Sequence, residues 1–158
     1  MTIDPETLYL FIIKALRSTY ATLGVEEVSS NKDGFKELIF QEGTLSYKDS
    51  YSGFFKSRGF EVVSQNGAPI WMSSYGGGMT KHDAKLAFET FTFLKKVFLA
   101  DTLGFKTFRG PHSFSDGLWD YYYSQEGDIT EFHGHEEIYY NHNLVFYHKT
   151  IGGEIREK

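Results

Sequence analysis

Two glutamates, Glu61 and Glu136, are the side chains of this sequence whose type and spacing most clearly suggest chemistry. Each lies two residues after a glycine and two residues before an aliphatic side chain, in Gly-Phe-Glu-Val-Val and Gly-His-Glu-Glu-Ile. In a β-strand this spacing places all three on one face. A carboxylate on an apolar face is partly buried, and burial raises its pKa unless it is paired. Two such groups in one cleft could bind a cationic ligand or act as an acid/base pair. The alternative is a structural role, in which each glutamate pairs with an arginine or accepts backbone N–H groups.

Arginine and aromatic side chains are available to complete such a site. Arg109 lies in Phe-Arg-Gly-Pro, a rigid loop sequence, and its guanidinium can pair with a buried glutamate or with a ligand carboxylate. The 15 Phe and 11 Tyr residues must build much of the core, yet they are numerous for a small one. Tyrosine and tryptophan in a groove suit a flat or cationic ligand, through stacking or cation–π contact. The walls that we predict for the cleft are Trp71, Tyr75, Trp119 and Tyr122.

Other motifs in the sequence favour no metal, cofactor or covalent chemistry. His133 and His135 share a strand face, as imidazole metal ligands do, but the acid expected after them is replaced by tyrosines, so we interpret them as exposed strand histidines. The glycines at 76–78 and 152–153 lack the Lys-Ser/Thr of a phosphate loop and favour bends where backbones approach closely. Cysteine is absent and no Gly-x-Ser-x-Gly occurs. We predict no metal and no cofactor.

The two glutamates belong to an internal repeat. Residues 57–79 and 132–154 align without a gap at a distance of 75, with five identities in 23 positions. His133 and His135 fall on Arg58 and Phe60, so the repeat favours the glutamates over the histidines as site residues. The identical pairs are Gly59 with Gly134, Glu61 with Glu136, Asn66 with Asn141, Gly77 with Gly152 and Gly78 with Gly153.

The elements that must position these residues follow from periodicity. One helix is predicted from an N-cap at Thr2 or Asp4, with Pro5 at the first helical position, to Leu23. Another is predicted from near His82-Asp83 to Leu103, and each is followed by glycine. Asn66-Gly67 predicts a two-residue hairpin turn. The fold class is therefore α+β, an internally duplicated α-β-β-β unit with an antiparallel sheet and two helices, forming a single domain over 1–158 with repeats at about 1–79 and 80–158. The predicted strands are 36–47, 54–64, 69–75, 117–124, 128–140 and 143–150.

The composition of the chain indicates which classes of binding partner to expect. The 158 residues carry a net charge of −5, which argues against nucleic acid, because phosphate binding requires a basic surface. The longest apolar run, Leu8–Ile13, is too short to cross a bilayer, and the first residues do not read as a signal peptide. We expect a soluble cytoplasmic domain with neither a nucleic-acid nor a membrane partner.

Several motifs resemble those of an uncharacterised bacterial domain family. They are Phe-Arg-Gly-Pro (108–111), Gly-Asp-Ile-x-x-Phe-x-Gly-x-Glu-x-Ile (127–138) and Ile-Gly-Gly-x-Ile (151–155), and the first half adds 51–53, 59–62 and 70–77. The resemblance covers nearly the whole chain. Members of that family occur alone or behind a helix-turn-helix regulator domain, and no helix-turn-helix is evident here, so the resemblance does not imply DNA binding.

A looser resemblance is topological. Repeating α-β-β-β is a cyclic shift of the β-α-β-β plan of gyrase-inhibitor-like effector-binding domains, whose cleft between duplicated halves binds lipophilic or cationic molecules near a central glutamate. By this analogy we expect an effector-type, small-molecule-binding domain with its cleft between two pseudo-symmetric halves and a cationic or aromatic ligand.

Two alternatives to a binding domain stay open, although we favour binding over catalysis. One is an acid/base hydrolase that pairs a cleft glutamate with His112, His133 or His135. The other is a homo-oligomeric interaction module, such as a homodimer formed through exposed Phe54 and Phe55.

Overall fold

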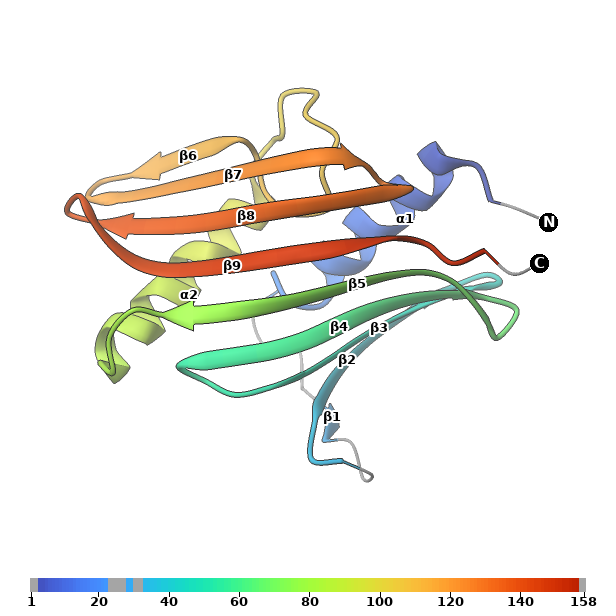
Figure 1. Ribbon diagram of the computed structural model, residues 1–158, viewed down its shortest axis with the longest axis horizontal. Helices are drawn as coiled ribbons and strands as arrows, with labels where there is room; N and C mark the ends of the chain where they lie inside the picture. Colours follow the sequence, from blue (N-terminus) through green and yellow to red (C-terminus); the bar gives the residue numbers. More distant parts are fainter. Residues whose placement is uncertain (1–2, 23–27, 30–32, 157–158) are drawn as a thin grey trace.

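The computed structural model describes residues 3–22, 28–29 and 33–156, and in this part of the chain two helices accompany one antiparallel sheet of nine strands (Figure 1). The strand order is β1-β2-β3-β4-β5-β9-β8-β7-β6, so the last strand of the chain pairs with β5 in the middle of the sheet. This confirms the α+β class. The elements are α1 Pro5–Ser18, β1 Val28–Ser29, β2 Lys36–Glu42, β3 Leu45–Ser52, β4 Lys56–Gln65, β5 Ala68–Met79, α2 Ala84–Leu99, β6 Ser113–Asp116, β7 Trp119–Asp128, β8 Glu131–Tyr140 and β9 Asn143–Glu154.

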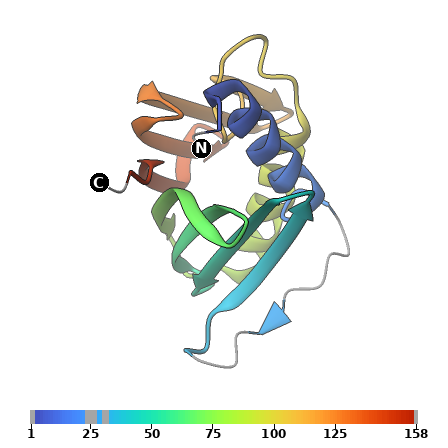
Figure 2. The ribbon, with the colours of Figure 1, turned by 90° about the vertical axis from the view of Figure 1, so that its right-hand side faces the viewer.

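The sheet curls, and both helices lie against its concave face (Figure 2). One apolar cluster joins α1 to β3, β4 and β5, with Trp71 and Val63 fully buried in it. A second cluster joins α2 to β7, β8 and β9, with Ile138 and Phe146 at its centre. Each helix therefore covers one half of the sheet.

The predicted helix starts are confirmed, whereas the predicted ends are too late. Asp4 caps α1 by accepting hydrogen bonds from two backbone N–H groups, and Asp83 caps α2 in the same way through one. α2 ends at Leu99, because Ala100 leaves the helical conformation with a ψ of 157°. Beyond it, the Asp101 carboxylate accepts from the N–H of Leu103, which adopts a φ of 50° in a turn. α1 ends at Ser18, and the predicted stop at 23–24 lies outside the described residues.

The predicted α-β-β-β unit lacks one strand in each half, since in the described chain β2 to β5 follow α1 after the two-residue β1, and β6 to β9 follow α2. The predicted strand 36–47 is two strands, β2 and β3, joined by a turn at Gly43 with a φ of 58°. The short β6 precedes a similar turn at Gly117, with a φ of 63°. Each turn contains a single glycine flanked by polar and apolar residues. This pattern is typical of a strand interior, so it does not predict a turn. The predicted Asn66-Gly67 hairpin turn is confirmed by φ angles of 50° and 83°.

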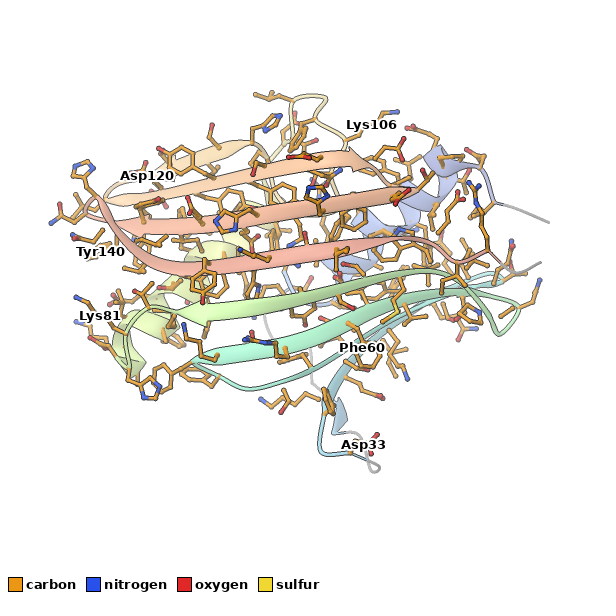
Figure 3. All side chains as sticks on the ribbon, viewed as in Figure 1. Asp33, Phe60, Lys81, Lys106, Asp120 and Tyr140 are labelled. Carbon is orange, nitrogen blue, oxygen red and sulfur yellow. The ribbon has the colours of Figure 1, made fainter. Side chains whose placement is uncertain are left out.

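Charged side chains gather at the periphery, as the labelled Lys81, Lys106 and Asp33 show, whereas Phe60 lies on the outer, convex face of the sheet (Figure 3). Among the described residues, neither helix has the length and apolar character needed to cross a membrane.

Candidate functional site

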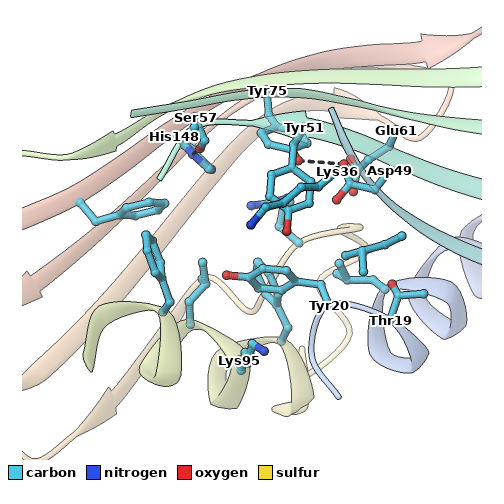
Figure 4. Close-up of a pocket in the computed structure, with 18 of the residues that line it drawn as sticks. Thr19, Tyr20, Lys36, Asp49, Tyr51, Ser57, Glu61, Tyr75, Lys95 and His148 are labelled. Atoms are coloured by element: carbon cyan, nitrogen blue, oxygen red, sulfur yellow. Dashed lines mark hydrogen bonds between the residues drawn. The ribbon is translucent and has the colours of Figure 1, made fainter. Parts of the chain in front are cut away.

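A cavity of about 270 Å³ lies between the concave face of the sheet and the helices (Figure 4). Strands β2 to β5 supply one wall, and α2 supplies the other with Phe91, Phe98 and Lys95. His148 of β9 and Arg109 of the segment after α2 complete the lining. The cavity thus draws residues from both ends of the chain into one space.

Glu61 is the deepest acidic group of this cavity. Its side chain is 1% exposed, and Tyr47 donates a hydrogen bond of 2.8 Å to its Oε1. Its Oε2 is buried without a hydrogen-bond partner. Burial raises the pKa of Glu61, and this outweighs the lowering by the charge of Arg109 and by the hydroxyls of Tyr47 and of Ser73, its neighbour on β5. The Oγ of Ser73 is likewise buried without a hydrogen bond of standard geometry. A buried carboxylate oxygen without a partner is costly for the fold and is therefore a natural place for a ligand donor to bind.

Glu136 is fully buried and differs from Glu61 in being paired. Arg109 donates from Nη2 to Oε2 at 2.9 Å and from Nε to Oε1 at 3.4 Å, and Tyr121 donates to Oε1 at 2.9 Å. Although burial raises the pKa of Glu136, the charge of Arg109 and these hydrogen bonds bring it below its ordinary value. The guanidinium lies over the ring of Phe98 at 4.8 Å and over that of Tyr75 at 5.7 Å. Arg109 is therefore a buried cation that links Glu136 to the aromatic side chains lining the cavity.

A second acid, Asp49 of β3, accepts a hydrogen bond of 2.7 Å from the hydroxyl of Tyr75 and is 5% exposed. Asp49 pairs with Glu61 across the β3–β4 ladder, so the two carboxylates are neighbours on the inner face. Figure 4 shows them together at one end of the cavity, with the tyrosines in between and Ser57 and His148 at the other end. The end of the cavity that contains Asp49 and Glu61, called the deep end below, is accordingly acidic.

His148 and Ser57 form a polar pair at the opposite end. The Oγ of Ser57 lies 3.0 Å from Nε2 of His148, and Nδ1 of His148 lies 3.7 Å from Oε2 of Glu136. Burial lowers the pKa of His148 to about 3, against the opposing charge of Glu136, and Arg109 lowers it further. The imidazole is therefore neutral at pH 7.

Below about pH 6.5, the folded protein is expected to lose stability as the pH falls, because the folded pKa of His148, about 3, lies below its ordinary 6.5. The unfolded chain then binds a proton that the folded one does not, which lowers the free energy of unfolding by roughly 1 kcal/mol per pH unit. The charged groups around His148 are Glu136, Arg109 and Arg58. Glu61 acts in the opposite direction, since its raised pKa gives stability that is present below 4.5 and lost as the pH rises through the folded pKa.

Urea unfolding of the wild type and of His148→Gln from pH 7 to about pH 4 measures this contribution. The variant is expected to lose less stability over the range, and parallel losses in the two proteins would contradict the assignment.

Comparison with known families places this site in a defined domain. Residues 49–155 match a domain of unknown function, DUF5680. The chain belongs to the DUF5680 family. Searches of curated proteins and of solved structures gave no significant match. The expectation of an uncharacterised domain family is thus confirmed.

The DUF5680 match contains Asp49, Ser57, Glu61, Arg109 and His148 of the cavity lining, together with Glu136 behind them. It begins in β3, so α1 and β2, which contribute Leu16 and Lys36 to the cavity, lie before it. The carboxylates, the arginine, the serine and the histidine discussed above therefore lie within the matched residues 49–155, whereas part of the cavity wall lies before them.

The structure brings some of the residues predicted from sequence to this DUF5680 cavity. Glu61, Tyr75 and Arg109 line it, and Glu136 contacts it through Arg109. Trp71 is instead fully buried under α1, where its indole donates to the backbone oxygen of Ile129 at 2.8 Å.

The other two predicted wall residues lie elsewhere. Trp119 does not line the cavity and packs on Phe93 of α2 and on Tyr140, and Tyr122 is 48% exposed and contacts Tyr139. Tyr122 is out of phase with its buried neighbours Tyr121 and Tyr123, so alternation places it on the outer face.

Sequence reasoning did not select Asp49, Ser57 or His148. Asp49 lies between apolar-face residues of β3, and this position could have been found from alternation alone once β3 was separated from β2. No local signal joins Ser57 to His148. His133 is largely exposed and His135 half-buried, and they contact Glu126 and Glu137 rather than the cavity.

Proposed function

We propose that this domain binds a small molecule carrying a protonated amine, with Glu61 as the anchor for the ammonium group. The observation that carries the proposal is the buried Oε2 of Glu61, which lacks a hydrogen-bond partner and lies in a cavity of about 270 Å³. An ammonium donor would satisfy that oxygen and favour the ionised carboxylate, which burial otherwise disfavours. The volume, just below the range of about 300–1,000 Å³ usual for drug-sized ligands, suits a compact ligand.

The charges around the cavity support a cationic ligand. Arg109 is bound by Glu136, and the neighbouring Glu61 and Asp49, each of which accepts a hydrogen bond from a tyrosine, place two further carboxylates beside the cavity. Two lysines also line the cavity, and Lys36 lies over the ring of Tyr51 while Lys95 lies over that of Tyr20. The acids are buried whereas these lysines are exposed or half-buried, so electrostatic selection acts more strongly at the acidic end. Phe98 and Tyr75 offer aromatic walls to an amine.

We further propose that the two halves are duplicated copies, and that the cavity lies where they meet. β8 and β9 begin and end 75 residues after β4 and β5. The central β5–β9 ladder pairs Tyr75 with Thr150, two residues that correspond under the same shift. Tyr47 donates to Glu61 at 2.8 Å, as Tyr121 does to Glu136 at 2.9 Å. Only one copy carries the arginine, so the duplicated glutamates have diverged into a paired one and an unpaired one.

Protonated aromatic amines such as benzylamine and tryptamine are expected to raise the unfolding temperature of the wild type, and Glu61→Gln is expected to weaken their Kd at least about tenfold. The reason is the loss of a charged hydrogen bond, which contributes about 1.5–3 kcal/mol. Without ligand at pH 7, Glu61→Gln is expected to unfold at the same or a higher temperature, because the amide removes a buried charge. Thermal shift and isothermal titration calorimetry measure both quantities.

Glu126→Gln is the matched control, because this glutamate is 83% exposed and remote from the cavity. It is expected to bind the amines as the wild type does. Benzoate, an anion of similar size to benzylamine, is expected to give no shift. Stabilisation by benzoate but not by the amines, or equal amine binding by Glu61→Gln, would overturn the proposal.

A further inference from the structure

Four residues lie in one row across four adjacent strands, next to the cavity. Ser57 of β4 pairs with Gly77 of β5, Gly77 pairs with His148 of β9, and His148 pairs with Glu136 of β8. Paired residues on a sheet lie side by side and share a face. The row therefore aligns a hydroxyl, an imidazole and a carboxylate in that order, with a glycine between the first two.

Gly77 is what allows the imidazole to reach Ser57. A Cβ at this position would lie 2.9 Å from Cδ2 of His148 and 2.0 Å from the backbone oxygen of Tyr147, and the φ is 154°. With no side chain on β5 in between, Nε2 of His148 spans one strand and lies 3.0 Å from Oγ of Ser57. Ser57 is half-buried, and both residues line the cavity.

The carboxylate completes the arrangement from the other side. If Nε2 accepts the proton of Ser57, Nδ1 carries the ring proton and faces Oε2 of Glu136 at 3.7 Å. This distance is longer than a hydrogen bond but within ion-pair range, so the charge of Glu136 offsets part of the lowering of the His148 pKa by burial and by Arg109. Nδ1 is buried and has no hydrogen-bond partner. Ser57, His148 and Glu136 thus follow one another in the order of nucleophile, general base and orienting carboxylate in enzymes that catalyse acyl transfer.

We propose that Ser57 is a nucleophile for acyl transfer, with His148 as its general base and Glu136 as the positioning carboxylate, acting on a small carboxylic ester. Oγ of Ser57 forms a bond to the acyl carbon while its proton moves to Nε2 of His148. The ester C–O bond then breaks, and the leaving alcohol takes that proton. Water releases the acid by the same route, so that one ester and one water give one acid and one alcohol.

The corresponding row of the other half carries different side chains. There Asp49, Glu61, Ser73, Gly152 and Phe132 follow one another across β3, β4, β5, β9 and β8. Phe132 occupies the place of Ser57 and Ser73 that of His148, around an equivalent glycine. The other half thus has a phenylalanine and a serine at these positions, so Ser57 and His148 are specific to one copy.

A small alkyl fluorophosphonate tests the proposal, because it reacts with serines that a neighbouring base activates. One equivalent is expected on Ser57 of the wild type, located by mass spectrometry of peptides. Ser57→Ala is expected to lose this adduct. His148→Gln is expected to form it at least about 100-fold more slowly, which is the lower end of general-base contributions. Absence of an adduct on Ser57 in the folded wild type would overturn the proposal.

Controls separate this inference from binding and from folding. Ser64→Ala removes another half-buried serine of β4 and is expected to leave the labelling rate unchanged. The thermal shift of Ser57→Ala with benzylamine is measured alongside its labelling, so loss of labelling and loss of ligand binding are distinguishable. Equal labelling rates for the wild type and for a folded His148→Gln would also overturn the proposal, because Ser57 would then react without its base.

Discussion

Replacing Arg109 with methionine is expected to lower the free energy of unfolding by about 3–5 kcal/mol, because Glu136 would stay buried without its counter-ion. Glu136 is fully buried and Arg109 is 6% exposed, so water cannot replace either partner. The guanidinium also lowers the pKa of Glu61, which would lose the same charge. Methionine keeps much of the apolar length that packs against Phe98, so the effect reports charge more than packing.

A double-mutant cycle separates these contributions. We expect Glu136→Gln alone to be destabilising, because it strands the buried guanidinium, and Arg109→Met with Glu136→Gln to be more stable than Arg109→Met alone. Urea unfolding of the four proteins at pH 7 gives the coupling. Additive effects would show that Arg109 and Glu136 do not act as a pair. An exposed pair, Lys96 with Asp116, is the comparison, and Lys96→Met is expected to change stability by less than about 1 kcal/mol.

A Gly78→Ala variant is expected to lose more than about 4 kcal/mol and to fold poorly, if at all. Gly78 has a φ of 135°, and an added Cβ would lie 2.1 Å from the backbone oxygen of Phe55 and 2.8 Å from Cα of Lys56. These are backbone atoms of the neighbouring strand connection, held in place because Met79 donates to the same Phe55 oxygen at 2.7 Å. The clash cannot be relieved by a side-chain rotation, so the strand must move.

Gly43→Ala is the matched control for this effect. Gly43 also has a positive φ, 58°, yet no atom lies within 4 Å of an added Cβ. Its expected loss is the conformational cost alone, about 1–2 kcal/mol. Circular dichroism with thermal unfolding compares the two variants. Similar unfolding temperatures for the two variants would show that the close backbone contacts are not the reason that position 78 requires a glycine.

Local chemistry made several features predictable from sequence. Asp4 and Asp83 are helix caps because a carboxylate before a helix satisfies free N–H groups wherever the helix lies in the fold. Asn66 and Gly67 form a hairpin turn because both tolerate a positive φ. Alternation with Val63 and Ile138 places Glu61 and Glu136 on the inner face. The helix ends and the separation of β2 from β3 were missed, because single-glycine and Asx turns give weak local signals.

The sequence by itself determined that two glutamates face inward in an α+β domain, because strand alternation and capping act over a few residues. Only the tertiary structure decided which glutamate Arg109 would pair, since pairing depends on where a loop meets the sheet. It also joined Ser57 to His148, 91 residues away, because β9 returns to pair with β5 in the middle of the sheet. Strand order is set by packing over the whole chain, so no window of sequence contains it.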